Sequence, residues 1–212
     1  NGIAMSALLG KKVGMTQVFA ENGDCVPVTV VHVERCVPVL KRTAEKDGYK
    51  AVMLAYGERK AKHTNKPLKG FYDKHKVEPA KILKEFRDQD IDDDAIGKPV
   101  SVDVFSEGDE VEVVGVSKGR GFSGVFRRFN YAGAPASHGH HESYRGTGSI
   151  GMHTYPGRVF KGTGMPGRMG GKSVHLKNLE VVRVDVENNV LLLKGSVPGA
   201  NGGLIRIFNR KG

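Results

Sequence analysis

The chain has 212 residues, a formal net charge of +10 and a pI near 9.6. The length suffices for one core or for a domain with an appendage, and the charge predicts a negatively charged partner: nucleic acid, an anionic membrane surface or an acidic protein. The longest apolar run, VPVTVVHV, is far shorter than the roughly 20 residues of a membrane span. We therefore expect a soluble protein, and we expect no membrane among its partners. Cys25 and Cys36, without an apolar leader, predict reduced thiols in the cytoplasm.

Most of the chain outside Lys118–Lys177 predicts β-structure, because β-branched runs alternate there with turn-like residues. Short strands at this spacing predict a mainly β fold with a closed or nearly closed barrel. Asn188 and Asn189 predict a turn between two of the later strands, and Asn1–Ala4, which precede Met5, carry no prediction. The predicted strands are Val26–Val33, Val37–Lys41, Tyr49–Tyr56, Val100–Phe105, Glu110–Val116, Leu179–Val186, Val190–Lys194 and Leu204–Phe208.

One helix is predicted at Glu78–Arg87, with Pro79 in its first turn and Ile82, Leu83 and Phe86 on one face. The preceding stretch, ERKAKHTNKPLKGFYDKHK, is basic and polar. It is either a surface loop or a second, smaller contact to the same negatively charged partner, and the sequence favours neither interpretation.

Charge and glycine are concentrated in one segment. Lys118–Lys177 contains 10 Lys and Arg against one acid, Glu142, and 14 of the 29 glycines. The remaining residues have 23 basic and 22 acidic side chains, so they are nearly neutral. Because a merely solvated surface mixes both signs, this partition predicts a near-neutral body with an inserted cationic segment that meets a polyanion.

The cationic segment has no periodic apolar pattern from which to build a core. Ordering 60 residues costs roughly 60–120 kcal/mol at about 1–2 kcal/mol per residue, and scattered apolar side chains do not offset this. We expect a partner to order the segment. If it runs out and back, it reaches at most roughly 100 Å at about 3.3 Å per residue. The scattered apolar residues are Phe122, Phe126, Phe129, Tyr144, Ile150 and Phe160.

The stretch SKGRGFSGVFRRF places Gly119, Gly121 and Gly124 at the G-x-G-x-x-G spacing of a dinucleotide site, directly after a predicted strand. However, Gly133 and Pro135 follow before a crossover helix of ordinary length can form, so a βαβ unit is not expected. The neighbouring arginines suit a polyanion backbone better than one buried cofactor.

Three nearby histidines, His138, His140 and His141, raise the possibility of a metal site, because imidazoles are common ligands. Their spacing matches no structural zinc pattern, and Glu142 is the only acid nearby. We therefore expect no metal, and histidines that donate hydrogen bonds to phosphates.

Asp88, Asp90 and Asp92 occupy the first, third and fifth places of a calcium loop, but Asp93 stands where glycine is needed and Pro99 where a bidentate glutamate is needed. We expect an exposed acidic loop. No nucleophile elbow, carboxylate pair or Cys–His pairing indicates catalysis, and no cofactor is expected.

Four separated motifs resemble the bacterial large-subunit ribosomal protein L3 family, in the family's order and over nearly the whole chain. They are GKKVGMTQVF, SKGRGFSGVFRRF, GSIGMHTYPGRVFKGTGMPGRMGG and KNLEVVRVD…LLLKGSVPGANGG. The resemblance implies a translation-factor-like β-barrel with a long loop that runs through ribosomal RNA toward the peptidyl transferase centre, and binding early in large-subunit assembly. It also implies neighbouring ribosomal proteins as partners and a cytoplasmic location in the ribosome, with no homo-oligomer and no enzyme activity.

The family's RNA-facing segments fall on residues 117–128 and 148–171. The cations there are expected to contact phosphates, the histidines and Arg145 between the two motifs to contact RNA, and His153 and Tyr155 to stack on bases near the catalytic RNA. The implied RNA contacts are Lys118, Arg120, Arg127, Arg128, His138, His140, His141, Arg145, His153, Tyr155, Arg158, Lys161, Arg168 and Lys172.

Two positions depart from the family pattern. Met152 stands where many bacterial members carry a methylated glutamine, and Glu112 stands where Asp or Asn is usual, which we expect to be harmless. The predicted organisation is residues 1–116 as the first part of the barrel, with a basic loop and helix at about 57–98, residues 117–177 as the RNA-binding loop, and residues 178–212 as the completing strands. Two alternative functions remain open: a dinucleotide-dependent enzyme that uses GRGFSG, and a free RNA chaperone.

Overall fold

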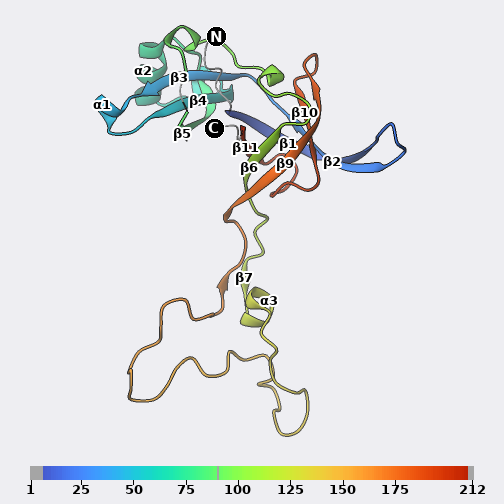
Figure 1. The fold of residues 1–212 in the computed structure, drawn as a ribbon. Helices are drawn as coiled ribbons and strands as arrows, with labels where there is room; N and C mark the ends of the chain where they lie inside the picture. The colour runs from blue at the N-terminus through green and yellow to red at the C-terminus, as the bar shows by residue number, and fades with distance from the viewer. Residues whose placement is uncertain (1–6, 90, 210–212) are drawn as a thin grey trace. The chain divides into compact units, whose positions relative to one another are not determined.

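The computed structural model describes residues 7–89 and 91–209, so Asn1–Ala4 and Asp90 lie outside the described residues. The chain divides into two compact units (Figure 1). Unit 1 combines the chain up to Val116 with the chain from Ser173 onward, and unit 2 is Ser117–Lys172. Residues 173–177, predicted as part of the loop, belong instead to a strand of unit 1.

Six antiparallel strands of unit 1 close into a barrel, in the order β1-β11-β6-β9-β10-β2. This confirms the predicted mainly β fold. Unit 2 is the connection between the neighbouring strands β6 and β9, whose last pair joins Val116 to Ser173. The barrel strands are β1 (Ala7–Phe19), β2 (Cys25–His32), β6 (Glu110–Val116), β9 (Ser173–Asp185), β10 (Val190–Lys194) and β11 (Leu204–Asn209).

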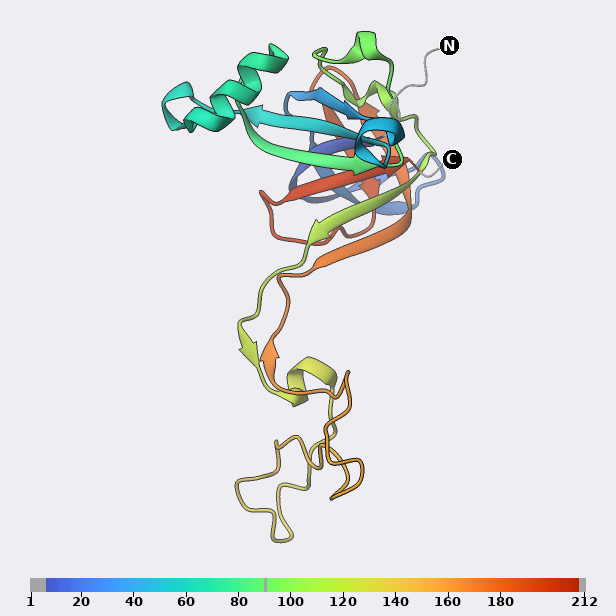
Figure 2. The ribbon, with the colours of Figure 1, turned by 90° about the vertical axis from the view of Figure 1, so that its left-hand side faces the viewer.

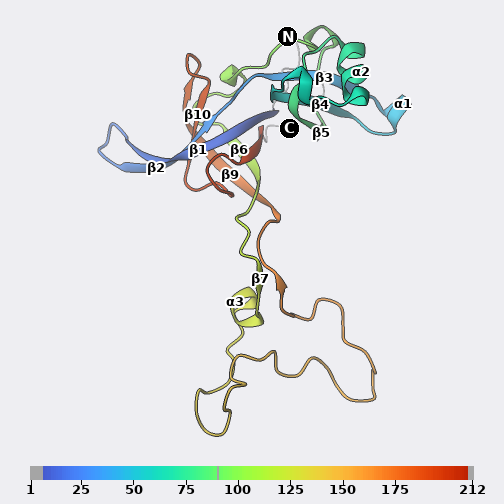
Figure 3. The ribbon, with the colours of Figure 1, turned by 180° about the vertical axis from the view of Figure 1, so that it is seen from behind.

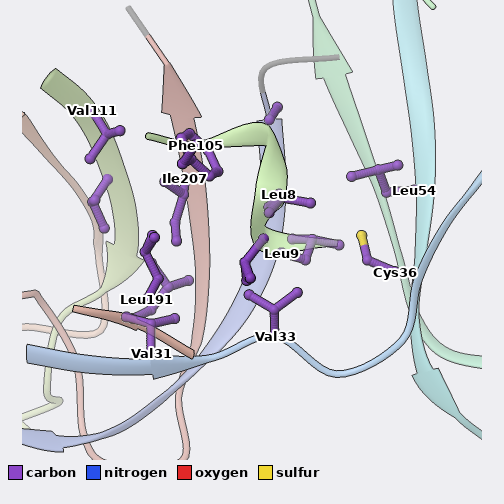
Figure 4. Close-up of a cluster of buried hydrophobic side chains, with 14 of the residues drawn as sticks. Leu8, Leu9, Val31, Val33, Cys36, Leu54, Phe105, Val111, Leu191 and Ile207 are labelled. Atoms are coloured by element: carbon purple, nitrogen blue, oxygen red, sulfur yellow. The ribbon is translucent and has the colours of Figure 1, made fainter. Parts of the chain in front are cut away.

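Along the barrel strands, side chains that point into the core alternate with side chains that point outward. In β10, Leu191 and Leu193 are fully buried while their neighbours are partly exposed, which is the two-residue period of a strand with one face on the core. Figure 4 shows Leu191 in one cluster with Leu8, Val31 and Ile207. Burial of such side chains contributes about 1.5–3 kcal/mol each, so this cluster is the main core of unit 1.

A second sheet, in the order β3-β4-β5, shares this core through Cys36, Leu54 and Phe86. The Phe86 ring lies 5.1 Å from the Phe208 ring of β11. Burial raises the pKa of the Cys36 thiol to about 11, because the thiolate would lose its hydration. The strands are β3 (Cys36–Arg42), β4 (Ala51–Glu58) and β5 (Ala80–Arg87), with the short helix α1 (Ala44–Asp47) between β3 and β4.

The connection from β4 to β5 is helical. It contains the 3-10 turn η1 (Ala61–His63) and the helix α2 (Lys66–His75), which lie beside the cyan and green strands of the second sheet (Figure 2). None of the helices in the described part of the chain is long and apolar enough to cross a membrane.

The helix predicted at Glu78–Arg87 is wrong, because this segment forms β5, which pairs with β4 along its whole length. Ile82 and Phe86 pack on the main core, whereas Leu83 packs on a second cluster under α2. A strand covered on both faces therefore places apolar residues at 82, 83 and 86, and this spacing is the same as that of a helix face.

The strand predicted at Val100–Phe105 is also wrong. Val100 forms one isolated bridge with Cys36, and Val102–Val104 form the 3-10 turn η3, while a second such turn, η2, spans Asp93–Ala95. Val102 and Phe105 are nevertheless buried in the core. The apolar residues of this stretch are buried, as in a strand, but their backbone forms a 3-10 turn.

The long strand β1 had no prediction. Its first half is buried in the barrel, and its second half pairs only with β2 to form a hairpin that extends away from the other strands (Figure 3). Lys12 is buried at 7% exposure, and its Nζ donates to the carbonyl oxygens of Val197, at 2.7 Å, and Gly199, at 3.3 Å. This lysine interrupts the apolar pattern by which the strand would be found.

Candidate nucleic-acid interface

Unit 2 begins and ends as two paired antiparallel arms. The Ser117 N–H donates to the Lys172 carbonyl at 2.9 Å, and the Arg120 N–H donates to the Met169 carbonyl at 2.9 Å. The pairing continues into the short strands β7 (Phe122–Ser123) and β8 (Gly167–Arg168). The arms are thus held by backbone hydrogen bonds, and their side chains are available for other contacts.

Glycine permits this close pairing at one position in particular. Gly170 has φ of +72°, and a Cβ there would lie 2.1 Å from the Lys118 carbonyl oxygen. Any other residue would clash with the opposite arm and adopt a rarely populated backbone conformation. The glycine content noted in the sequence therefore has a structural reason here.

A short helix, α3 (Val125–Phe129), follows β7 and carries two of the predicted phosphate contacts. Arg127 is exposed, but Arg128 is only partly exposed, and its Nη1 donates to the Met165 carbonyl at 2.6 Å. The Tyr131 hydroxyl donates to the Gly164 carbonyl at 3.3 Å. Arg128 and Tyr131 thus join the two sides of unit 2 just beyond the paired arms, so Arg128 has a structural role that the sequence did not indicate.

The part of unit 2 between α3 and β8 has turns and bends but no helix or strand, and every residue of this part is described. Neither apolar core cluster of the described chain includes a unit 2 residue. Within unit 2 only Ser123, Val125 and Gly164 are buried. The expectation that this segment lacks a core of its own agrees with this geometry.

Large apolar and aromatic side chains are exposed along unit 2. Tyr155 is 87% exposed, Phe122 78% and Met152 69%. Arginines lie against other aromatic rings: the Arg145 Cζ is 4.4 Å from the Phe126 ring centroid. Exposed rings next to cations are typical of surfaces on which bases stack and phosphates bind. Phe122 is not among the residues predicted to contact RNA, although an aromatic residue between glycines and near a cation fits that pattern.

All of the predicted RNA contacts lie in unit 2, distributed over its whole length. Most of their side chains are exposed; Arg128 is the partly exposed one. Lys118, Arg120, Arg168 and Lys172 lie on the paired arms, and Arg127 and Arg128 lie on α3. The others lie on the outer loop, which is the part of unit 2 between α3 and β8: His138, His140, His141, Arg145, His153, Tyr155, Arg158 and Lys161.

The dinucleotide pattern has no matching geometry. The helix after Gly124 has only five residues, and β7 pairs antiparallel with β8, whereas a dinucleotide site needs a parallel βαβ unit. A hollow of about 570 Å³ in unit 2 is lined by residues 131–134, 140, 143, 144 and 146–148 and does not include the pattern's glycines.

The three nearby histidines belong to no cluster of possible metal ligands in the described residues. Within residues 7–89 and 91–209, no three His, Cys, Asp or Glu side chains come together as a metal site would require. Both His138 and His141 have positive φ, of 61° and 45°, in a turn-rich stretch.

Unit 2 carries nine Lys and Arg and a single acid, Glu142, within 56 residues. A closed β-barrel that carries a basic segment without a core of its own, with exposed cations and aromatic rings, is typical of structural proteins that bind nucleic acid.

Comparison with known proteins gives the family. A family model described as Ribosomal protein L3 matches residues 77–186. The large ribosomal subunit protein uL3 of Petrotoga mobilis is 47% identical over 203 residues, which cover 96% of this chain and 94% of the relative. The uL3 proteins of Thermotoga petrophila and Thermosipho melanesiensis are 49% and 48% identical, over 98% of this chain and 98% and 99% of the relatives. The chain therefore belongs to the ribosomal protein L3 family, which confirms the resemblance seen in its motifs.

Proposed function

We propose that the protein is a structural constituent of the large ribosomal subunit in the cytoplasm and that unit 2 binds large-subunit ribosomal RNA. The observation that carries this proposal is the charge of unit 2: nine Lys and Arg against one acid, most of them exposed, in a segment without a core. Membership of the ribosomal protein L3 family supports the same partner.

In this proposal the cations of unit 2 neutralise phosphates of RNA helices that pack around it. Phosphate contacts position a protein on RNA without reading sequence. Glycines allow backbone to approach the RNA closely, and the exposed rings of Tyr155 and Phe122 stack on unpaired bases. Ordering of the segment is driven by these contacts, which suits a protein that binds early in subunit assembly and supports the peptidyl transferase centre through its outer loop.

Unit 1 holds the segment and meets neighbouring large-subunit proteins. The hairpin of β1 and β2 exposes Val13, Met15 and Phe19, at 53%, 51% and 67%. Three large apolar side chains exposed on one hairpin are a candidate surface for a protein contact. We propose that the protein does not form a homo-oligomer.

The protein performs no reaction in this proposal, and its effect on peptide-bond formation is indirect, through the shape of the RNA. The dinucleotide-dependent enzyme is the competing function from another class. It requires saturable binding of NAD or FAD that Gly121→Glu abolishes, and we expect no such binding in a cofactor titration.

The salt dependence of RNA binding tests the proposal. The full chain is compared with Arg120→Gln/Lys161→Gln/Arg168→Gln, because all three side chains are exposed. Each phosphate contact contributes roughly 0.7–0.9 to the slope of log K against log salt, so the steepness of the slope should fall by about 2–3. The charge-matched control is Lys46→Gln/Lys98→Gln/Lys194→Gln, in unit 1. If both triple changes lower the slope equally, unit 2 contributes to RNA binding only through the net charge of the protein, and the proposal is refuted.

Sedimentation of a cell extract distinguishes the ribosomal constituent from a free RNA chaperone. The chain should remain with the large subunit at salt concentrations that remove loosely held factors. Its distribution over many RNAs outside that particle would support the chaperone instead.

A further inference from the structure

A second cationic surface lies in unit 1, on the connection from β4 to β5. We call residues 59–76 the α2 surface. It carries a single acid, Asp73, and all of its Lys and Arg side chains are exposed. They are Arg59, Lys60, Lys62, Lys66, Lys69, Lys74 and Lys76.

Packing fixes which side of α2 faces outward. Tyr72 is 2% exposed and its hydroxyl donates to the Ala80 carbonyl at 3.3 Å. Leu68 and Phe71 pack with it on the second apolar cluster, which includes Val39 of β3. Because residues three and four apart share one face of a helix, these contacts turn Lys66 and Lys69 away from the sheet.

The cations of the α2 surface form no ion pair within the part of the chain that the structure describes. None of the seven forms an ion pair with a carboxylate in residues 7–89 or 91–209. Lys66 stands at the start of α2, and the first turn contains no acid. Because the positive end of the helix dipole disfavours cations there, this arrangement weakens the free helix and would be relieved by a bound anion.

Gly70 in the middle of α2 is a second, independent observation. Its φ is not positive, it is exposed, and a Cβ added there would have nothing within 4 Å. No packing or backbone conformation in the protein thus requires glycine, although glycine weakens a helix interior relative to alanine. It leaves an open, low surface next to Lys66 and Lys69, as close approach of an RNA backbone requires.

The chemistry of the α2 surface favours RNA over protein or membrane. None of the large apolar side chains exposed in the described chain lies between residues 59 and 76. Protein interfaces have apolar and aromatic centres and are depleted in lysine, and a membrane-bound helix needs apolar side chains to insert. A phosphate backbone needs only exposed cations.

We propose that the α2 surface is a second phosphate-binding site for large-subunit ribosomal RNA, separate from unit 2. The proposal rests on the function proposed above. It assigns Lys62, Lys66 and Lys69 to phosphates and Gly70 to the point of closest approach. It also selects the second of the two interpretations that the sequence left open for this stretch.

The test measures binding of the full chain to purified, deproteinised large-subunit ribosomal RNA over a range of salt. Lys62→Gln/Lys66→Gln/Lys69→Gln should lower the steepness of the salt slope by about 2–3. Glutamine preserves helix propensity, and an unchanged thermal transition confirms that α2 is intact. The charge-matched control, Lys46→Gln/Lys98→Gln/Lys194→Gln, should change the slope by less than 1.

Gly70→Leu adds a test that does not change charge. Leucine is a better helix former than glycine, so the melting temperature of the free protein should rise. RNA affinity should fall at least threefold, because the side chain projects where the RNA approaches. Higher stability with unchanged affinity would overturn the assignment of Gly70.

The outcomes separate this inference from the proposed function. If the α2 triple change behaves as its control does, while the unit 2 triple change lowers the slope, the α2 surface does not bind RNA and the function proposed for unit 2 stands. An acidic protein is then the better partner for this surface. If the unit 2 change also has no effect, the proposed function itself fails.

Discussion

Removal of unit 2 should leave a folded and slightly more stable protein. The variant replaces residues 118–171 with a four-residue Gly/Ser linker and keeps Ser117 and Lys172, whose backbones are hydrogen bonded. No residue of either core cluster is removed. The net charge falls from +10 to +3, because eight Lys and Arg and one Glu are lost.

The magnitude follows from the length of the connection between β6 and β9. The cost of closing a loop grows as about 3/2 RT ln n, so shortening 54 residues to four stabilises the folded state by at most about 2 kcal/mol. For a protein of this size, each kcal/mol raises the melting temperature by about 2–4 °C, which predicts an increase of about 4–8 °C. Lower net charge acts in the same direction, since it reduces self-repulsion.

Thermal unfolding followed by circular dichroism measures the change, with the full chain in the same buffer as reference. A single cooperative transition at a higher temperature is expected, and ribosomal RNA binding should lose most of its salt dependence. A lost transition, or a fall of several degrees, would mean that unit 2 stabilises the barrel and would refute the two-part organisation.

Two further predictions concern unit 1. Burial raises the pKa of Cys36 from 9.0 to about 11. The contribution of the buried, protonated thiol to the stability of the folded state is therefore complete below about pH 9 and is lost as pH rises to about 11. The difference in unfolding free energy between the unchanged chain and Cys36→Ala should shrink by about 3 kcal/mol over this range in urea titrations; a constant difference would contradict the assignment. Hydrogen bonds from the Asn188 side chain and N–H lower the pKa of Asp185. Its contribution is present above the ordinary carboxyl pKa and is lost as pH falls through the lowered value, so Asp185→Asn should destabilise at neutral pH but not in strong acid; equal effects at both pH values would rule this out.

Prediction from sequence succeeded for most strands, including β3 and β4, in which consecutive residues are buried, and failed for β5. The strands Glu110–Val116 and Val190–Lys194 have the predicted bounds, because alternation is visible in the sequence. β5 was predicted as a helix because packing on two sides hides the period. The actual helix, Lys66–His75, has its apolar face shortened to Leu68, Phe71 and Tyr72, so the sequence showed mainly its lysines.

The sequence predicts RNA contacts for Arg127 and Arg128 alike, and it does not predict the internal contacts of unit 2. Arg127 and Arg128 are adjacent and identical in sequence, yet Arg127 is exposed and Arg128 donates to the Met165 carbonyl. That carbonyl lies 37 residues away along the chain, and nothing local distinguishes the two arginines. Only the path of the chain shows which of the two arginines makes a contact within the protein.

The amino-acid sequence by itself determined the mainly β body, the place and sign of the cationic segment and the family. These are properties of composition, period and motif order, which do not depend on contacts between distant residues. Only the tertiary structure decided that six strands close into one barrel while three others form a second sheet, that Arg128 is a structural residue, and that α2 turns its lysines outward. Each of these depends on residues far apart in the chain, because burial and hydrogen bonding select among locally similar alternatives.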